Sequence, residues 1–404
     1  STLNNIVTLI EDSLASKSEI ENKANELSKS FSISILSIAF LTFIGWYFYN
    51  GSFEDALINS ISVIIIACPC ALALATPMAS LIGISWLAKK RLLFKESKYL
   101  ETLAKTTTVV FDKTGTLTDG KLSVTNVVQK EEGNLKLIYS IVDNSNHPIS
   151  LAVKKYIENQ DENIKSNDLQ NFEVLAGKGM KGLYEAKEVL AGNVQLMKEF
   201  GITCDIQSSS SLFVVALNGK VIAYFELEDT IKENSLQTIE YLESENINVV
   251  MLTGDNDEVA KKVAKNLEIE NFRANMTPID KANYLDELKK QGEVVVMVGD
   301  GINDALALAK ADISISMGSG ADVSISISDI VVLDNSLQGI IDSFTISKRT
   351  YKFIKQNLSI SLVYNVITIP LAVFGFVIPL VAALSMSLSS LLVVGNSLRI
   401  KRKG

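Results

Sequence analysis

The sequence predicts four transmembrane helices that flank a soluble α/β body, and three observations support this architecture. The chain has 404 residues, 47% of them hydrophobic, and a mean hydropathy of +0.24. Between the second and third apolar stretches lie short apolar runs typical of buried parallel strands. Four stretches approach or exceed the roughly 20 residues that span a bilayer, and they lie at about 31–49, 57–84, 357–375 and 379–398.

Basic residues predict how these helices are oriented. The connectors 50–55 and 375–379 contain no Lys or Arg, which is typical of the side opposite the cytosol. Four buried helices of a soluble protein are the alternative, but the matching charge asymmetry of the two hairpins disfavours it. The cytosolic ends carry Lys89, Lys90, Arg91, Lys348, Arg349, Lys352, Arg399, Lys401, Arg402 and Lys403.

Composition excludes several classes of function. A formal charge of −8 and a pI near 5.0, without a basic stripe interleaved with aromatic residues, argue against nucleic-acid binding. Three cysteines, two of them one residue apart, do not form a disulfide framework and instead suggest metal binding. Residues 1–30 do not have the pattern of a signal peptide, so internal segments must direct membrane insertion.

A candidate nucleophile follows a predicted buried strand. The run Thr107–Phe111 leads directly into Asp112-Lys113-Thr114-Gly115-Thr116. Open α/β sheets bind ligands at the carboxyl ends of their strands, and a carboxylate there can attack a phosphoryl group to form an aspartyl phosphate. A lone Asp before a glycine turn would be ordinary turn chemistry. The full pentamer in this context favours phosphoryl transfer.

Two further motifs follow, TGDN at 253–256 and GDGIND at 299–304, each after an apolar run. Together with DKTGTLT at 112–118 they resemble the P-type ATPases. The resemblance implies an α/β haloacid-dehalogenase-like, Rossmann-type phosphorylation domain with an inserted α+β nucleotide-binding domain.

The resemblance also implies residue roles. Mg²⁺ would be held by Asp112, Asp300 and the carbonyl of Thr114, and hard oxygen ligands suit this ion. Asp229 and Lys232 resemble a further stretch near the site, although a surface salt bridge explains them equally well. The implied catalytic residues are Asp112, Lys113, Thr114, Thr253, Lys281, Asp300 and Asn303.

A third group of residues resembles the nucleotide-binding domain of the heavy-metal subgroup. A loop histidine or a GxGxxG string alone is a weak signal, and order and spacing strengthen it. The family usually has Glu five residues before the histidine, whereas Val142 stands here with Asp143 beside it. Adenine recognition is therefore expected to differ in detail. The implied ATP contacts are His147, Gly177, Gly179, Gly192 and Asn193.

Cys68-Pro69-Cys70 lies in the middle of the second apolar stretch, where polar groups are costly and usually functional. Proline breaks the helix there, and soft thiolates select Cu(I) or Zn(II) over Mg²⁺ or Ca²⁺. Two buried cysteines beside a packing kink are the alternative.

The last two stretches distinguish between metals. Asn357, Tyr364-Asn365 and Pro370, then Met386, Ser389 and Ser390, resemble the signatures of the copper subgroup, and no Asp or Glu lies in either stretch. A thioether suits Cu(I) better than Zn(II), although Met386 alone would be ordinary core filling. The implied ligands of the transported metal are Cys68, Cys70, Tyr364, Asn365, Met386 and Ser390.

The resemblance as a whole implies ATP-driven Cu(I) transport, with export from the cytosol, through an integral membrane protein of the bacterial plasma membrane whose ATP-binding domains are cytoplasmic. The lipid bilayer is one expected partner and a copper chaperone is a candidate donor. No actuator loop, earlier transmembrane pair or CxxC domain is found, so we expect slow hydrolysis of the aspartyl phosphate and dependence on the actuator-bearing half. The expected parts are a stalk at 1–30, transmembrane hairpins at 31–98 and 347–404, a phosphorylation domain at 99–125 and 223–346, and a nucleotide-binding domain at 126–222.

Three alternatives stay open. The first is a Zn/Cd pump. The second is a membrane-tethered haloacid-dehalogenase-like phosphatase acting on small phosphate esters. The third is a truncated partner or metal-binding module that needs the other half in trans.

Overall fold

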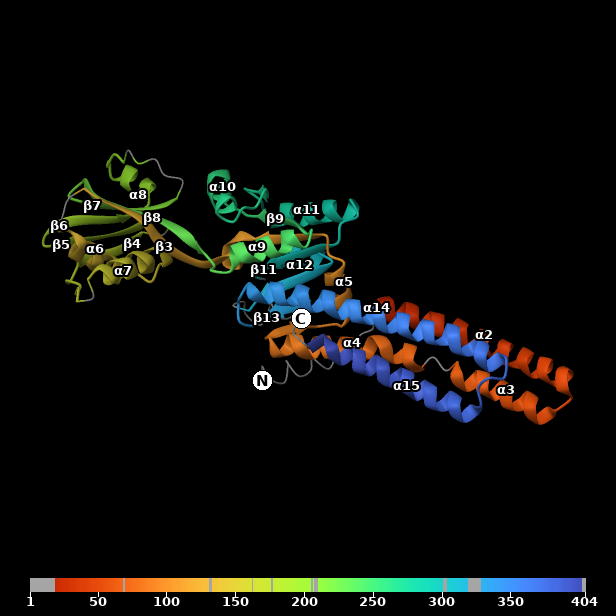
Figure 1. Ribbon diagram of the computed structural model, residues 1–404. Coiled ribbons are helices and arrows are strands. Elements are labelled where there is room, and N and C mark those ends of the chain that lie inside the picture. Colours follow the sequence, from red (N-terminus) through yellow and green to blue (C-terminus); the bar gives the residue numbers. More distant parts are fainter. Residues whose placement is uncertain are drawn as a thin grey trace. The chain divides into compact units, whose positions relative to one another are not determined.

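The structure is a computed structural model (Figure 1), and it divides into two compact units that are treated separately. The first comprises Ser1–Val110, Glu240–Val249 and Pro278–Gly404, and the second comprises Phe111–Ile239 and Val250–Thr277. The residues that the structure describes are 19–67, 70–130, 133–161, 163–175, 177–204, 206, 210–300, 304–318 and 328–401.

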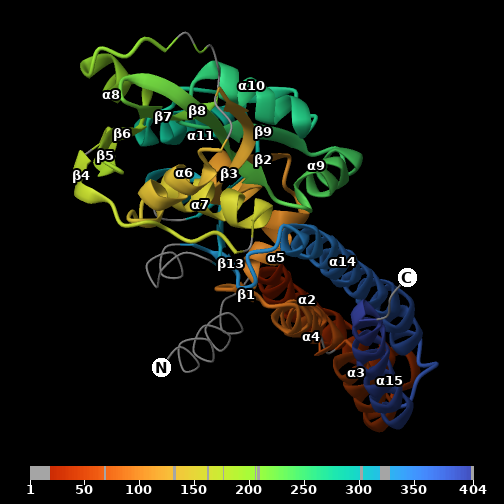
Figure 2. The ribbon, with the colours of Figure 1, turned by 90° about the vertical axis from the view of Figure 1, so that its left-hand side faces the viewer.

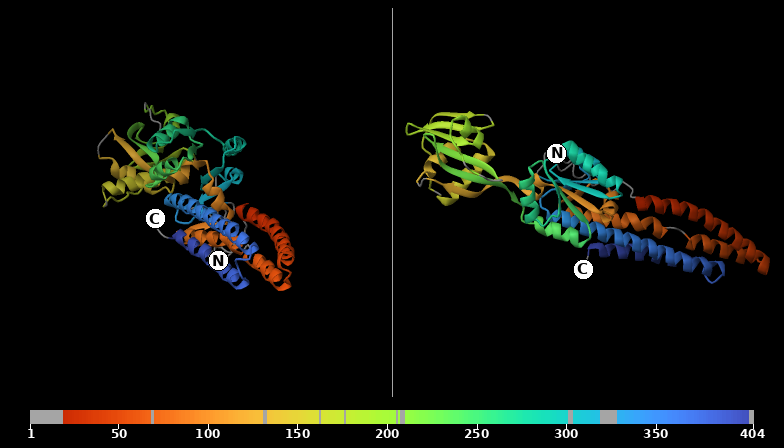
Figure 3. Two further views of the ribbon diagram at one scale, coloured as in Figure 1. Left: turned by 45° about the vertical axis from the view of Figure 1, so that its right-hand side comes forward. Right: turned by 90° about the horizontal axis from the view of Figure 1, so that it is seen from above.

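Long helices of the first unit form a bundle in which α2 packs on α3, and α4 packs on both α14 and α15. Figures 1 and 3 show these helices running side by side. Their apolar composition lets the bundle bury small and aliphatic side chains inside while large ones face outward. The bounds are α2 (Glu19–Asn50), α3 (Phe53–Ile66), α4 (Cys70–Lys89), α14 (Gln338–Val373) and α15 (Pro379–Leu398).

Three of the four predicted spans are confirmed as single helices long and apolar enough to cross a membrane, namely Phe31–Asn50, Gln338–Val373 and Pro379–Lys401. The second predicted span is instead divided into α3, of 14 residues, and α4, of 20 residues. Cys68 and Pro69 between them lie outside the described residues, so the expected helix break at the CPC motif stays a prediction. Lipid-suited apolar side chains cover the outer faces, and the fold is that of an integral membrane protein.

The first unit also contains most of a twisted sheet whose order is β1-β13-β12-β11-β2-β9-β10. β1 pairs antiparallel with β13, whereas β13, β12 and β11 are parallel. Within this unit the Thr108 N–H donates to the carbonyl of Val294, and the Asn248 N–H donates to that of Thr107, so the beginnings of β2 and β9 continue the sheet. The strands are β1 (Leu92–Phe94), β2 (Thr108–Asp112), β9 (Asn248–Leu252), β10 (Asn271–Arg273), β11 (Val295–Gly299), β12 (Ile313–Met317) and β13 (Ile330–Val332).

Short helices connect the strands of this sheet, of which α10 and β10 lie in the second unit. β2, β11 and β12 are buried along their whole length, because parallel strands are covered on both faces. This explains why they appear in the sequence as unbroken apolar runs. The helices are α5 (Lys98–Ala104), α9 (Ser235–Ser244), α10 (Asp257–Asn266), α11 (Pro278–Lys290) and α12 (Ala305–Lys310), and a 3₁₀ turn, η2, covers Arg399–Lys401.

The second unit contains a six-stranded antiparallel sheet of order β3-β8-β7-β6-β5-β4. Helices α6 and α7 lie together on one face of it (Figures 1 and 2) and enclose an apolar core that includes Phe213 and Phe225. The bounds are β3 (Thr118–Gln129), α6 (Leu135–Asp143), α7 (Pro148–Gln160), β4 (Gln170–Leu175), β5 (Gly179–Tyr184), β6 (Lys187–Gly192), α8 (Val194–Glu199), β7 (Ser211–Leu217) and β8 (Lys220–Ile231).

The predicted fold class, an α/β sheet with an inserted α+β domain and membrane helices, is confirmed by these elements. β3 and β8 pair from Thr118 and Ile231 to Gln129 and Ala223, so the domain boundaries predicted at 125/126 and 222/223 fall inside two continuous strands. The division into domains stays a prediction.

Candidate functional site

The candidate nucleophile is the last residue of a fully buried strand. Asp112 ends β2 and is 6% exposed. Its extended backbone (φ −70°, ψ 151°) leads into a wide turn over Lys113–Leu117, in which Gly115 has φ +74°. That conformation strains residues with a Cβ, so glycine suits the position. The turn brings backbone groups next to the carboxylate.

Hydrogen bonds from β8 and α9 hold this turn. The Lys232 ammonium donates to the Gly115 carbonyl (3.0 Å), and the Ser235 hydroxyl donates to the Leu117 carbonyl (2.8 Å). Burial lowers the pKa of Lys232 to about 8, although the charges of Asp119 and Asp229 oppose this effect.

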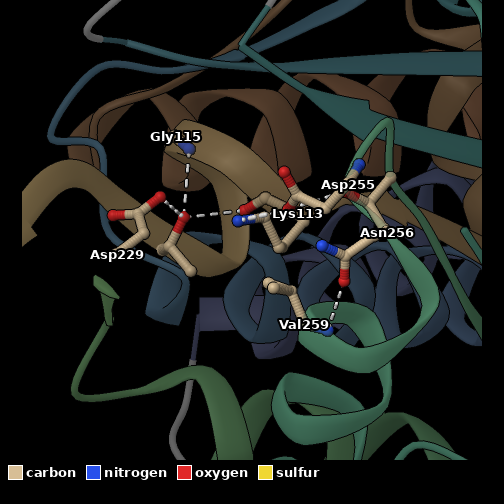
Figure 4. A network of polar contacts seen from close by, with 8 residues as sticks. Lys113, Gly115, Asp229, Asp255, Asn256 and Val259 are labelled. Carbon is tan, nitrogen blue, oxygen red and sulfur yellow. Dashed lines mark hydrogen bonds and ion pairs between the residues drawn. The ribbon is translucent and has the colours of Figure 1, made fainter. Parts of the chain in front are cut away.

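Thr118 connects the turn to Asp229. Its hydroxyl accepts from the Gly115 N–H (3.3 Å) and lies within hydrogen-bonding distance of the Lys113 carbonyl (3.0 Å) and the Asp229 carboxylate (Figure 4). Its single proton can go to either acceptor. Burial raises the pKa of the Asp229 carboxyl, and the Thr118 hydrogen bond and the Lys113 charge oppose this. The sequence predicts Asp229 and Lys232 near the site, and it leaves open whether they act there or form only a surface salt bridge.

Lys113 points toward the loop after β9. Its Nζ lies 2.6 Å from Asp255 Oδ2, with the lysine side chain 7% and the aspartate side chain 37% exposed. Thr253, which is buried, donates its hydroxyl to the same carboxylate (3.0 Å) and accepts from the Asp255 N–H (3.1 Å). The second unit thus brings the predicted residues Lys113 and Thr253 together through Asp255. The sequence analysis named no role for Asp255, although it lies in the TGDN motif.

A pocket of about 680 Å³ opens beside these groups within the second unit. Lys113, Thr114 and Asp255 line it at one end, and Lys262 on α10 contributes a second cation that pairs with Glu228. The carboxylates of Glu228, Asp229 and Asp255 also line the pocket, so an anionic ligand would have to displace a carboxylate from each lysine that it binds. Asn256 caps α10 through the Val259 N–H (3.0 Å), as Figure 4 shows.

The first unit contains the other predicted catalytic residues. Asp300 follows β11, and Lys281 on α11 forms a buried ion pair with Asp304 (Nζ to Oδ1, 2.7 Å). Burial raises the pKa of the Asp304 carboxyl, which the Lys281 charge opposes. Asn303 lies outside the described residues. No role was predicted for Asp304, and its place at the end of the GDGIND motif was the available signal.

Of the predicted nucleotide residues, Gly179 and Gly192 lie at strand ends, Gly177 lies in a turn, and His147 and Asn193 are helix N-caps. A Cβ on Gly179 would lie 2.3 Å from the Ala191 carbonyl oxygen, and one on Gly192 would lie 2.2 Å from that of Lys178. Both glycines are therefore needed for the close approach of β5 and β6. Asn193 caps α8 through the Leu196 N–H (2.9 Å) and donates to the Gly177 carbonyl (3.2 Å).

His147 is the N-cap of α7, and its Nδ1 accepts from the Ile149 N–H (3.3 Å). A neutral ring would therefore carry its proton on Nε2. Val142, the departure from the family pattern, is fully buried in the core. Asp143 is paired with Lys154 (2.6 Å), and this hydrogen bond lowers the pKa of Asp143. Neither residue replaces the usual glutamate as a free acceptor.

The predicted metal path is described in part. Cys68 and Pro69 lie outside the described residues, as does the side chain of Cys70. Asn365 on α14 is buried, and its Oδ1 has no hydrogen-bond partner among the described residues. Met386 on α15 is partly buried, and its carbonyl accepts from the Ser390 hydroxyl (3.3 Å).

Other polar groups of the bundle divide into paired and unpaired ones. Tyr364 Oη lies 2.9 Å from Ser385 Oγ, and the fully buried Asn357 donates to Ser397 (2.8 Å). In contrast, the buried hydroxyls of Thr76 on α4 and Ser389 on α15 have no partner within the described ranges. Buried polar atoms without partners are costly in a membrane protein and frequently mark ion pathways.

Comparison with known proteins defines the class first. A haloacid dehalogenase-like hydrolase family profile matches residues 106–312, and the chain belongs to this family. The particular relatives are heavy-metal pumps. Copper-exporting P-type ATPases of Staphylococcus haemolyticus, Staphylococcus epidermidis and Staphylococcus aureus are 39%, 38% and 36% identical over 99% of this chain. The chain spans about half the length of these relatives, 51%, 52% and 51%.

Solved structures of heavy-metal ATPases also resemble this chain. A zinc-transporting PIB-type ATPase in its E2.Pi state matches 98% of this chain and 67% of its own, with a TM-score of 0.84 and 28% identity. The catalytic domain of a CPx-ATPase matches 66% of this chain and 98% of its own, with a TM-score of 0.55 and 30% identity. The resemblance to heavy-metal P-type ATPases is thereby confirmed.

Proposed function

We propose that this chain forms the catalytic and membrane-spanning part of an ATP-driven Cu(I) pump, which exports the ion from the cytosol through an aspartyl-phosphate intermediate. The observation that carries the proposal is the position of Asp112, which ends a buried strand beside a pocket that contains Lys113 and Asp255. Copper-exporting relatives at 36 to 39% identity support Cu(I) as the transported ion.

Asp112 is the proposed nucleophile. Its carboxylate oxygen forms a bond to the terminal phosphorus of ATP while the bond to the bridging oxygen breaks and ADP leaves. Negative charge spreads over the phosphoryl oxygens in this step, so nearby donors accelerate it. Lys113 and Thr253 are the proposed donors because Asp255 already orients both. Lys281 and Asn303 are proposed as further contacts from the first unit.

The donor set is suited to Mg²⁺. Asp112 and Asp300 each follow the end of a buried strand, and the Thr114 carbonyl belongs to the turn that Gly115 permits. These three residues would hold the ion through hard oxygen atoms. When bound, Mg²⁺ supplies positive charge to the phosphates.

ATP is proposed to contact the second unit through His147, Gly177, Gly179, Gly192 and Asn193. Gly179 and Gly192 permit the close approach of β5 and β6, which brings Gly177 and Asn193 together at one end of these strands. His147 presents its ring at the start of α7. Because Val142 is buried and Asp143 is paired with Lys154, we expect adenine recognition to depend on the histidine.

Cu(I) is proposed to pass through the helix bundle. Cys68 and Cys70 are the proposed soft ligands from the second predicted span, and Met386 adds a soft, uncharged sulfur. Tyr364, Asn365 and Ser390 are the further proposed ligands, supported by the unpartnered Oδ1 of Asn365. Metal at these groups would favour the state in which Asp112 accepts phosphate, which couples the two processes as a population shift.

The chain covers about half of its relatives, so we propose that an actuator-bearing portion completes the cycle and that a copper chaperone delivers the ion. The staphylococcal relatives support a bacterial plasma membrane location with the ATP-binding parts in the cytoplasm. Co-purification with an actuator-bearing chain tests the first point.

The deciding experiment is acid-stable labelling from γ-labelled ATP with Cu(I), Zn(II) or no metal, with Asp112→Asn as the blank. We expect label that depends on Cu(I), is absent from Asp112→Asn, and falls at least tenfold in Cys68→Ala/Cys70→Ala. Label that ignores Cu(I), or that persists in Asp112→Asn, contradicts the proposal.

Two other functions are favoured by specific observations. The zinc-transporting structure with a TM-score of 0.84 favours a Zn(II) or Cd(II) pump, which the Zn(II) arm of the same experiment detects. The hydrolase family match favours a phosphatase. Rapid turnover of small phosphate esters by the Cys68→Ala/Cys70→Ala variant would support that alternative.

A further inference from the structure

A hollow of about 580 Å³ lies where α14 meets the end of α15, and the proposed transport chemistry does not use it. These two helices run side by side (Figure 3) and pack on each other. The polar residues that line the hollow come from both helices and are Lys352, Lys355, Gln356, Ser359, Asn396 and Arg399.

The wall on α14 is one continuous helix face. Lys352, Lys355, Gln356 and Ser359 recur at spacings of three and four residues, which places them above one another. Both lysines are exposed, and neither has a carboxylate partner among the residues that the structure describes. The sequence has no Asp or Glu after Asp342. The positive charge of the hollow is therefore not compensated locally.

The wall on α15 is held by hydrogen bonds. Arg399 Nη1 donates to Asn396 Oδ1 (3.0 Å), and Asn396 Nδ2 donates to Oδ1 of the buried Asn357 (2.9 Å). The Arg399 guanidinium also lies 5.7 Å from the ring centre of Phe353. These contacts fix the end of α15 beside α14, so the hollow belongs to the folded bundle.

Both helix faces continue away from the hollow as exposed apolar surface. On α14 the following residues are Ile360, Val363 and Ile367, which are 37%, 57% and 57% exposed. On α15 the residues before Asn396 include Leu392 and Leu388, which are 56% and 59% exposed. A basic polar hollow at the end of an apolar strip matches a molecule with an anionic head and a hydrocarbon tail. A small soluble anion would make no use of the strip.

We propose that this hollow binds the phosphate of an anionic phospholipid, with the acyl chains along the apolar strip between α14 and α15. Basic pockets between transmembrane helices on the cytoplasmic side are suited to such head groups. The positions of Lys348, Arg349 and Lys352 place the hollow at the cytoplasmic end of the third span. The site requires only that the chain spans a membrane, and it is independent of the metal that is transported.

The test is binding of tail-labelled phosphatidylglycerol to the purified, delipidated full chain in detergent. The variant is Lys352→Gln/Lys355→Gln, and the matched control is Lys89→Gln/Lys401→Gln, which removes the same charge from exposed residues outside the hollow. Each lysine near an anionic surface strengthens binding about fivefold, so we expect affinity to fall roughly 25-fold in the hollow variant. The control is expected to stay within about twofold of the wild type.

Three further measurements decide between sources of the phosphate. Phosphatidylcholine, which has no net charge, is expected to bind at least tenfold more weakly to the wild type. Inorganic phosphate and glycerol 3-phosphate are expected not to displace the lipid at equal concentration. Full displacement by either, equal binding of phosphatidylcholine, or an equal loss in the control variant would overturn the proposal.

Discussion

Two lysine–aspartate pairs, one in each unit of the molecule, have the same chemistry but different surroundings. Lys113 and Asp255 approach to 2.6 Å, and the aspartate side chain is 37% exposed beside the pocket of the second unit. Lys281 and Asp304 approach to 2.7 Å in the first unit, and their side chains are 8% and 1% exposed. The Lys113–Asp255 pair is therefore open, because solvent reaches its aspartate, whereas the Lys281–Asp304 pair is sealed from solvent.

This difference in solvent exposure indicates that the two pairs have different roles. In a sealed pair, each charge depends on the other because water cannot replace a lost partner. In an open pair, water or an incoming anion can replace the carboxylate at modest cost. Lys113 can therefore change partners from Asp255 to a phosphoryl group at a lower cost than Lys281 can leave Asp304.

The largest effect is expected for Asp304→Ala, which removes the carboxylate from the buried ammonium of Lys281. Breaking one side of a buried pair costs about 3 to 5 kcal/mol. We expect the free energy of unfolding of the full chain in detergent to fall by that amount in denaturant titrations. Lys281→Met/Asp304→Leu should recover most of it, and a stable Asp304→Ala would show that the pair is not needed.

Asp255→Ala is expected to cost only about 1 kcal/mol of stability, because the carboxylate it removes is partly solvated. Its effect on chemistry should be larger, since Lys113 and Thr253 both lose the group that orients them. We expect phosphate incorporation from ATP to slow about tenfold. Asp257→Ala, on an exposed position of α10, is the control and should leave the rate unchanged. Equal rates for Asp255→Ala and the wild type would remove the orienting role.

The pH dependence of stability gives a smaller effect at Lys232. Burial lowers the pKa of Lys232 to about 8, whereas an unfolded lysine titrates near about 10.4. Between these values the unfolded chain holds more protons, so a rise in pH favours the folded state. We expect the melting temperature of the wild type, relative to Lys232→Met, to rise between about pH 8 and pH 10. A constant difference would mean that Lys232 titrates normally.

Salt should produce the smallest effect. Screening weakens exposed charge pairs more than buried ones, and the Debye length falls to about 3 Å at 1 M salt. We expect the destabilisation caused by Asp255→Ala to shrink by a few tenths of a kcal/mol in 1 M NaCl, measured by the same titrations. The destabilisation caused by Asp304→Ala should not change. If both shrink alike, the second pair is more accessible than its burial indicates.

Much of this arrangement could be predicted from the sequence because it depends on local patterns. An unbroken apolar run followed by DKTGT predicted a buried strand that ends at Asp112, and β2 ends there. Three long apolar stretches predicted membrane-spanning helices by their length and composition, and each is a single helix. Residue type and spacing alone decide such features.

Partner choice could not be predicted in this way. Nothing local indicates that Lys281 pairs with Asp304, 23 residues away, or that Gly179 and Gly192 are needed because two strands approach closely. Likewise, the hollow at Lys352 and Arg399 exists only because α14 and α15 pack on each other.

The sequence by itself determined where strands end, where membrane helices run and which nucleophile is available, because hydrophobic period and turn chemistry act over a few residues. The tertiary structure alone decided which charges are sealed and which are open. Burial depends on the elements that pack over a side chain. Asp255 and Asp304 each lie in a loop motif after a strand, yet the side chain of Asp255 is 37% exposed and that of Asp304 is 1% exposed.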